Sequence, residues 1–316
     1  MSDAPRLLCL DTVLIDVALR VAVLPQRAGD VLASEKLVTT GGGFNAMSAA
    51  ARHNMRVVYA GRLGAGPFSS LAATALETEH IAAPIEPNGA LDTGICVVLL
   101  EPDGERSFVT SPGAEATLRG SDLEALDVKA NDYVLVSGYN IMYPELAKTV
   151  LAWIARLAPE VTVFFDPATR AVDIPKSNLD AVIERSNWLL CNAFEALTLT
   201  QGDDAIEAAA SLASRNDTLD VLVRRGAKGC VVARNHQDAV VVEGFATTVV
   251  DTTGAGDVHN GVFVAELASG HDAFAAARWA NAAAAMAISH FGPATGPRRD
   301  DVERWIAQFN ERASPR

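Results

Sequence analysis

Continuous apolar runs alternate with helix-like segments along most of the chain. The runs at 7–10, 57–60, 133–136, 161–165, 188–191 and 221–223 predict buried strands. Between them, the apolar spacing predicts helices near 44–54, 68–80, 144–157, 204–215, 257–269 and 272–289. Strands that are apolar on both faces are typical of a parallel sheet covered by helices on each side. The pattern therefore predicts an α/β fold with a doubly wound, mainly parallel sheet and an active site at the carboxyl ends of its strands.

Two segments interrupt this alternation. Residues 17–39 follow the first strand but give no crossover helix. Residues 93–111 contain two strand-like runs around a turn with Asp103 and Gly104. Together the two segments could form a small sheet that lies over the site as a lid, although an edge hairpin and a surface loop fit the same pattern. With this lid included, we expect a single domain over residues 1–316.

Composition narrows the class of protein. An apolar fraction of 49% over 316 residues allows a substantial core. The formal net charge of −13 argues against nucleic acid as a partner, because phosphate backbones are bound by clustered lysine and arginine. No apolar run reaches the roughly 20 residues of a membrane span, and the N-terminus does not resemble a signal peptide. The 4 cysteines are isolated in apolar runs, so we expect reduced thiols and a cytoplasmic protein.

The most informative segment of the chain is Asp251-Thr252-Thr253-Gly254-Ala255-Gly256-Asp257. It follows a strand-like run at 247–250 and precedes a predicted helix. Small residues at such a junction leave backbone N–H groups uncovered, and the dipole of the helix adds partial positive charge. This combination predicts an anion hole in which Asp257 is a base aimed at a substrate hydroxyl. A glycine-rich turn with Asp257 as a helix cap is the simpler interpretation.

This segment resembles the second signature of the ribokinase-like (PfkB) carbohydrate kinases. The first signature of the same family is similar to Gly41-Gly42-Gly43-Phe44-Asn45, and the further motifs follow in the family's order as far as Gly296. The resemblance implies a Rossmann-like fold with a small β lid. It also implies ATP-dependent phosphorylation of a hydroxymethyl group on a small sugar or nucleoside. Asp257 would be the general base, and the anion hole would consist of Gly254, Ala255 and Gly256.

The resemblance also implies a substrate site, composed of Asp16, Gly41, Gly42, Asn45 and Arg170. Asp16 would bind sugar hydroxyls, with Asp11 as the alternative residue. Asn45 offers both a donor and an acceptor, which suits hydroxyl groups. Arg170 would neutralise phosphate charge, although an arginine on a surface loop fits the same position.

The nucleotide side is implied in the same way, with Asn192, Glu195, Arg224, Gly226, Gly229, Thr253 and Asn281 as its residues. Glu195 would position Mg²⁺ on the phosphates of ATP through a bound water. A capping box between Asn192 and Glu195 accounts for the same spacing. Arg224 stands where threonine is common in the family, and a hairpin turn would account for Gly226 and Gly229.

Ribokinase-type members bind a monovalent cation in a loop near the anion hole. The residues of this chain that align with that loop are Asp251, Thr253, Ala287, His290, Gly292 and Gly296. A potassium requirement is therefore a hypothesis that the resemblance raises.

Several alternatives stay open. A kinase of a phosphorylated sugar needs a second phosphate pocket, and the segment from Gly41 to Asn45 carries no lysine or arginine, although Arg52 and Arg170 are available. A non-catalytic ligand-binding protein of the same fold would bind without phosphoryl transfer. Lid sheets with exposed edges often pair, so a homodimer through the lid is a further hypothesis.

Overall fold

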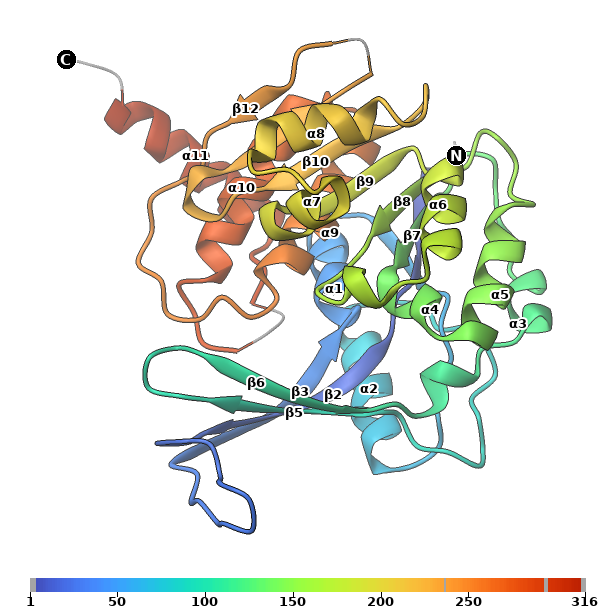
Figure 1. Cartoon of the computed structure of the whole chain (residues 1–316), viewed down its shortest axis with the longest axis vertical. Coiled ribbons are helices and arrows are strands. Elements are labelled where there is room, and N and C mark those ends of the chain that lie inside the picture. Colours follow the sequence, from blue (N-terminus) through green and yellow to red (C-terminus); the bar gives the residue numbers. More distant parts are fainter. Residues whose placement is uncertain (1–3, 236, 293–294, 314–316) are drawn as a thin grey trace.

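The main sheet has eight strands in the order β12-β11-β10-β9-β8-β7-β1-β4 (Figure 1). The structure is a computed structural model that describes residues 4–235, 237–292 and 295–313. The strands of this sheet are β1 (Arg6–Leu10), β4 (Arg56–Tyr59), β7 (Tyr133–Ser137), β8 (Thr162–Asp166), β9 (Trp188–Asn192), β10 (Asp220–Arg224), β11 (Cys230–Ala233) and β12 (Val240–Val242). All neighbours from β4 to β10 pair in parallel, whereas β11 and β12 are antiparallel.

Helices cover both faces of this sheet because its strands are apolar on both sides. The helices are α1 (Phe44–Arg52), α2 (Pro67–Thr78), α3 (Gly120–Glu124), α4 (Gly138–Met142), α5 (Pro144–Ile154), α6 (Lys176–Arg185), α7 (Ala193–Thr200), α8 (Ala205–Ala213), α9 (Ala255–Ala268), α10 (Ala273–Ala287) and α11 (Arg299–Ala313). Leu7 and Cys9 pack with α1, α2, α9 and α10, whereas Leu8 and Leu10 pack with the helices from α3 to α8. The predicted doubly wound sheet is therefore confirmed.

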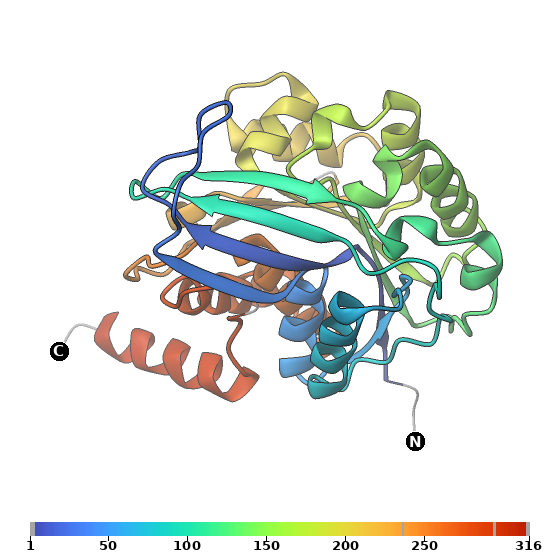
Figure 2. The same ribbon diagram turned by 90° about the horizontal axis from the view of Figure 1, so that it is seen from below.

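A second, four-stranded sheet lies apart from the main one, at the bottom of Figure 1 and across the front of Figure 2. We call it the small sheet. Its order is β3 (Glu35–Gly42), β2 (Val13–Arg20), β5 (Ile95–Leu100) and β6 (Arg106–Ser111). β2 begins before residue 17 and β3 ends after residue 39, so Asp16 and Gly41 lie within these paired strands.

Some predicted boundaries were wrong. The run at 247–250 is not a strand, and its Val249 and Val250 are 59% and 57% exposed. Its β-branched residues favour extended backbone, but no neighbouring strand pairs with them in the described structure. The short strands β11 and β12 and the C-terminal helix α11 were not predicted. Among the described residues, no helix is long and apolar enough to cross a bilayer.

The packing of α1 against α9 positions the first residues of both helices. Gly261 of α9 faces the backbone of α1, since a Cβ at this glycine would lie 2.1 Å from the carbonyl oxygen of Ala46. Without that side chain the two helices approach closely, and their N-terminal turns lie together. One of these turns contains Asn45 and the other contains Asp257.

Candidate active site

Polar residues gather where the parallel strands end. Asp11 follows β1, Ser137 ends β7, and Asp166, Asn192 and Arg224 are the last residues of β8, β9 and β10. Because the carboxyl ends of parallel strands share one edge of the sheet, these side chains are brought together from separate parts of the sequence. The expected position of the site at this edge agrees with their placement.

Asp257 lies in the first turn of α9. The helix begins directly after its N-cap residue Gly254, which has a positive φ of 72°. Its Oδ2 accepts a hydrogen bond of 3.0 Å from Nδ2 of Asn45. Burial raises the pKa of Asp257 to about 6, and the Asn45 hydrogen bond opposes that rise. Oδ1 of Asn45 is buried and has no hydrogen-bond partner in the described structure. The pair thus presents a carboxylate whose pKa is close to neutral pH, beside Oδ1 of Asn45 as an acceptor without a partner among the described residues.

Asp11 and Asp16 both lie close enough to Asp257 to respond to its charge. Burial, with Asp257 adding to it, raises the pKa of each to about 7. The glycines of the first signature make room for them: a Cβ on Gly41 would lie 1.9 Å from Oδ2 of Asp16, and one on Gly43 would lie 2.5 Å from Cβ of Asp11. The sequence offered these aspartates as alternatives, but the structure places both at the site.

Arg224, the last residue of β10, connects the end of β8 with the first turn of α7 and with α9. Its Nη2 is 3.2 Å from Oδ2 of Asp166 and 3.7 Å from Oε2 of Glu195. Its Nη1 donates to Oδ1 of Asn260, and the amide of Asn260 donates back to Asp166. Arg224, Asp166 and Asn260 therefore form a closed ring of hydrogen bonds, which we call the Arg224 ring. The guanidinium also lies beside residues 251–257, the segment of the predicted anion hole, which we call the anion loop. Its Cζ is 3.5 Å from the position of a Cβ on Gly256.

Asn192 and Glu195 form the capping box that their spacing allows. Oδ1 of Asn192 accepts from the backbone N–H of Glu195 at 2.9 Å, and Oε2 of Glu195 accepts from the N–H of Asn192 at 2.8 Å. Burial and the neighbouring Asp166 raise the pKa of Glu195, although Arg224 opposes them. The capping role and a place beside the charged site are thus combined in one side chain.

Gly226, Gly229 and Asn281, which the sequence also predicts on the nucleotide side, have different surroundings in the structure. Gly226 and Gly229 flank the short 3₁₀ helix η3 (Gly226–Lys228) between the antiparallel strands β10 and β11, as a hairpin turn requires. No atom lies within 4 Å of a Cβ at Gly226, so a ligand can approach the backbone there. Asn281 instead holds local structure: it donates to the carbonyls of Val242 and Glu243, and its Oδ1 lies 3.0 Å from Nε2 of His259.

Asp251 and the loop after α10 are joined to the small sheet. Oδ1 of Asp251 accepts from Thr253 and from Nη2 of Arg106, the first residue of β6, and Oδ2 accepts from the N–H of Gly292. The carbonyls of Ala287 and Gly296 accept from Thr295 and Arg52. Nδ1 of His290 lies within hydrogen-bond distance of Oγ of Ser289 and of the carbonyl of Met286. Residues 293 and 294 of this loop lie outside the described residues.

Two arginines that could bind phosphate are engaged elsewhere. Arg170 is 59% exposed and pairs with Asp173 at 2.7 Å. No hydrogen bond or ion pair within residues 4–235, 237–292 and 295–313 joins it to Asp257 or the Arg224 ring. Arg52 binds Glu79 at 2.6 Å as well as the carbonyl of Gly296. The structure therefore does not bring Arg170 to the predicted site.

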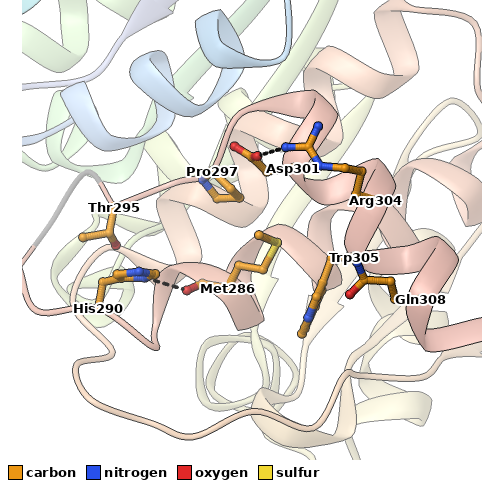
Figure 3. Close-up of a pocket in the computed structure, with 8 residues that line it drawn as sticks. All are labelled: Met286, His290, Thr295, Pro297, Asp301, Arg304, Trp305 and Gln308. Atoms are coloured by element: carbon orange, nitrogen blue, oxygen red, sulfur yellow. Dashed lines mark hydrogen bonds and ion pairs between the residues drawn. The ribbon is translucent and has the colours of Figure 1, made fainter. Parts of the chain in front are cut away.

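A separate cavity of about 350 Å³ lies between the end of α10 and α11 (Figure 3). Met286, His290 and Trp305 are among its lining residues, and its charged residues Asp301 and Arg304 pair with each other. None of the carboxylates around Asp257 lines it. The cavity is thus distinct from the strand-end site.

Comparison with known proteins gives the same assignment as the geometry. The model of the pfkB family of carbohydrate kinases matches residues 4–300. The chain belongs to this family. It is 30% identical to the sugar kinase YegV of Escherichia coli strain K12 over 299 residues, which is 91% of this chain and 90% of YegV. The predicted family and the class of enzyme, a carbohydrate kinase, are therefore confirmed.

Solved structures show the same fold. The ribokinase of Thermotoga maritima superposes with a TM-score of 0.83 at 24% identity, covering 96% of this chain and 99% of that chain. The ribokinase of Arabidopsis thaliana, solved with ribose and ATP, superposes with a TM-score of 0.77 at 23% identity over 96% of this chain and 99% of that chain. The ribokinase-like fold is thus the fold of this pfkB kinase.

Three site residues were missed by sequence reasoning. Asp166, Asn260 and Arg106 are not among the site residues that the sequence predicts. Asn260 lies three positions after Asp257 on α9, so the helical repeat places it on the same side of the helix as Asp257. That spacing was a usable signal. Nothing in the local sequence signals the contact of Arg106, since its partner is 145 residues away.

The Arg224 ring generates a stability prediction for this kinase. Replacing Arg224 by methionine leaves Asp166 and Glu195 largely buried without their counter-charge. We expect the free energy of unfolding at pH 8 to fall by about 3–5 kcal/mol, the usual cost of removing one partner of a buried pair. Urea denaturation would measure it.

The matched control is Arg234→Met. Arg234 also pairs with an aspartate, Asp220, but its side chain is 46% exposed. An exposed pair contributes about 0–1 kcal/mol. Equal losses in the two variants would show that Arg224 does not neutralise the strand-end carboxylates.

Proposed function

We propose that this kinase transfers the γ-phosphoryl group of ATP to a hydroxymethyl group of a small, unphosphorylated sugar or nucleoside, with Asp257 as general base. The observation that carries the proposal is the Asp257–Asn45 pair. A carboxylate with a pKa of about 6 is ionised at neutral pH and is basic enough to accept a hydroxyl proton as oxygen attacks phosphorus.

The chain supplies each part of that transfer. The hydroxyl proton passes to Asp257 as the new P–O bond forms, and the bond from the γ-phosphorus to ADP breaks. Oδ1 of Asn45 is placed to accept a hydrogen bond from a substrate hydroxyl. Asp11 and Asp16, each with a pKa of about 7, can donate to or accept from further hydroxyl groups. Because these acids surround one point, the site favours a small polyhydroxylated substrate.

The anion side of the site is built from backbone and arginine. The start of α9 is where the helix dipole favours negative charge, and the N–H of Gly256 lies in this first turn, whereas the N–H of Ala255 donates to the carbonyl of Thr252 at 3.2 Å. The Arg224 guanidinium lies beside Gly256, so it can stabilise negative charge on the transferring oxygens. Gly226 leaves open space for the more distant phosphates or the nucleoside, and Thr253 and Asn192 border the same side.

Carboxylate oxygens of Asp166 and Glu195 fit a hard divalent cation. Both already pair with Nη2 of Arg224, at 3.2 and 3.7 Å, so a metal ion would lie beside this guanidinium and not between the two carboxylates. Mg²⁺ prefers oxygen ligands and keeps several waters. Bound together with ATP, it would neutralise phosphate charge, and Glu195 would position it through a bound water.

An unphosphorylated substrate is favoured over a phosphorylated one. Arg52 and Arg170, the two arginines that the sequence left available for a second phosphate, are bonded to Glu79 and Asp173. The substrate side instead presents the carboxyl groups of Asp11 and Asp16, which repel a second phosphate. The same intact set of acids argues against a non-catalytic binding protein.

The first prediction concerns turnover. We expect Asp257→Asn to lower kcat by about 10²- to 10⁴-fold, the usual contribution of general-base assistance, while KM for ATP changes little. ADP release would be measured with Mg·ATP and ribose, fructose, 2-keto-3-deoxygluconate, adenosine, inosine, pseudouridine and fructose 6-phosphate. Asp204→Asn is the control, because Asp204 is an exposed aspartate at the start of α8. Near-normal turnover of Asp257→Asn would contradict the proposed base.

A second prediction concerns pH. Asp257 must be ionised to accept a proton, so kcat/KM should rise with pH through about 6 and level off above about 8, where Asp11 and Asp16, each with a pKa of about 7, are also ionised. The Asn45 hydrogen bond lowers the pKa of Asp257, so Asn45→Ala should move this acidic limb to higher pH. Asn178→Ala removes an amide that donates to the Ile141 carbonyl, and should leave the limb in place. An unmoved limb in Asn45→Ala would argue against Asp257 as the titrating group.

A third prediction concerns the small sheet, which we propose acts as a lid and as the surface of a homodimer. Its outer strands β3 and β6 have open edges and expose Val38, Phe108 and Val109 at 45%, 59% and 64%. We expect light scattering at micromolar concentration to give twice the chain mass of 33.3 kDa, and Phe108→Glu to give the monomer. Leu71→Glu, on α2, is the control. A wild-type monomer would reject the dimer.

A further inference from the structure

Arg106 joins the small sheet to the anion loop. It is the first residue of β6, and its Nη2 donates to Oδ1 of Asp251 while its Nη1 donates to Oγ1 of Thr252 at 3.0 Å. The exposed fractions of the two side chains are 19% for Arg106 and 6% for Asp251. A largely buried guanidinium thus sits against the first two residues of the segment that forms the proposed anion hole.

The carboxylate of Asp251 has little capacity left for another cation. Oδ1 accepts from the N–H and Oγ1 of Thr253 at 2.9 and 2.7 Å as well as from Arg106, and Oδ2 accepts from the N–H of Gly292 at 3.0 Å. Burial raises the pKa of Asp251, but these donors and the Arg106 charge outweigh it and hold the pKa below its usual range. The carboxylate is therefore ionised and already compensated.

The neighbouring carbonyl oxygens are engaged in the same way. The carbonyl of Ala287 accepts from Oγ1 of Thr295 at 3.1 Å and from the N–H of His290 at 3.1 Å. The carbonyl of Gly296 accepts from Nη1 of Arg52 at 2.6 Å. A monovalent cation would need these oxygens to turn toward it. The residues aligned with a cation loop do not fit that use here, because hydrogen-bond donors of the chain itself occupy three of them.

The small sheet rests on this loop at further points. The Arg20 guanidinium of β2 lies 5.4 Å from the ring centre of Phe291. Cδ2 of Leu37, on β3, would be 2.9 Å from a Cβ at Gly292. Three strands of the small sheet therefore contact the loop that would surround the cation, and Arg106 is the contact that brings full positive charge to Asp251.

We propose that the Arg106 guanidinium takes the place of a monovalent cation at Asp251, so that the small sheet itself holds the anion loop in shape and the kinase needs no potassium. A guanidinium donates two directed hydrogen bonds, here to Asp251 and Thr252, whereas a potassium ion gathers oxygens without direction. Charge compensation then depends on the position of the small sheet. Opening this sheet removes the positive charge from the anion loop, and closing it restores that charge.

The test measures thermal unfolding, so it is independent of the proposed function and of the substrate. Wild type and Arg106→Met would be unfolded in potassium chloride and in tetramethylammonium chloride at one ionic strength. We expect no difference between the salts for wild type. In Arg106→Met the position that the guanidinium leaves, beside Oδ1 of Asp251 and Oγ1 of Thr252, should take up potassium, which should raise the midpoint by about 2 °C over tetramethylammonium. Lys36→Met, which removes an exposed charge from β3, should behave like wild type.

Either of two results would overturn the proposal. One is a saturable, potassium-specific rise in the wild-type midpoint, which would show a cation site beside Arg106. The other is an Arg106→Met protein that unfolds at the same midpoint in both salts, which would show that the guanidinium replaces nothing. Arg106→Gln, which keeps a neutral hydrogen-bond donor, serves in place of Arg106→Met if that variant does not fold. Once a substrate is found, turnover of Arg106→Met should recover with potassium while wild-type turnover stays constant.

Discussion

Charge compensation by Arg224 is the constraint on which the rest of the site depends. Asp257 raises the pKa of both Asp11 and Asp16, and Asp166 at the end of β8 and Glu195 in the first turn of α7 belong to the same group of carboxylates. Carboxylates that share a poorly hydrated site cannot all be ionised without a counter-charge. Arg224 contacts Asp166 and Glu195 directly and also lowers the pKa of Asp257. Asp257, the proposed base, can therefore be ionised near neutral pH although burial disfavours its charge.

Five parallel strands, β1, β7, β8, β9 and β10, end at the candidate site, and the contacts of Arg224 depend on their order. The guanidinium of Arg224 on β10 can reach Asp166 on β8 and Glu195 in the first turn of α7 because β8, β9 and β10 are parallel neighbours in register, with Arg224 opposite Asn192. Asn260 closes the ring from α9, and Gly261 beside it lets α9 approach α1. Asn260, which takes part in the Arg224 ring, and Gly261, which lets α9 pack closely on α1, are therefore adjacent residues of the same helix.

Most strands of the main sheet and the motif residues of the candidate site could be predicted, because the sequence signals for them are local. Parallel strands such as β7 and β9 are short, continuous apolar runs, and a run of that kind in a helical context has few other interpretations. Gly41, Asn45 and Asp257 lie within motifs in which the spacing itself defines the geometry. Where a run lacked a pairing partner, as at 247–250, local propensity gave the wrong element, since strands depend on neighbours that the local sequence does not show.

Contacts between distant segments were beyond sequence reasoning. The ion pair of Arg106 with Asp251 spans 145 residues, and the ion pair of Arg224 with Asp166 spans 58. A charged side chain has several rotatable bonds, and only the folded arrangement of β6 or β10 decides which carboxylate it meets. Arg170 shows the converse: its motif favoured a site role, but its loop turns it to Asp173 at the surface.

The small sheet brings residues to two sides of the candidate site. It places Asp16 and Gly41 on the proposed substrate side through β2 and β3, and it places Arg106 against the anion loop through β6. The strands β2, β5 and β6 are hydrogen-bonded neighbours, so these groups move together if the sheet moves as one body. A substrate that draws Asp16 toward Asp257 would thereby also press Arg106 onto Asp251. Substrate binding and charge compensation of the anion loop are then coupled through a single sheet, without a separate ion.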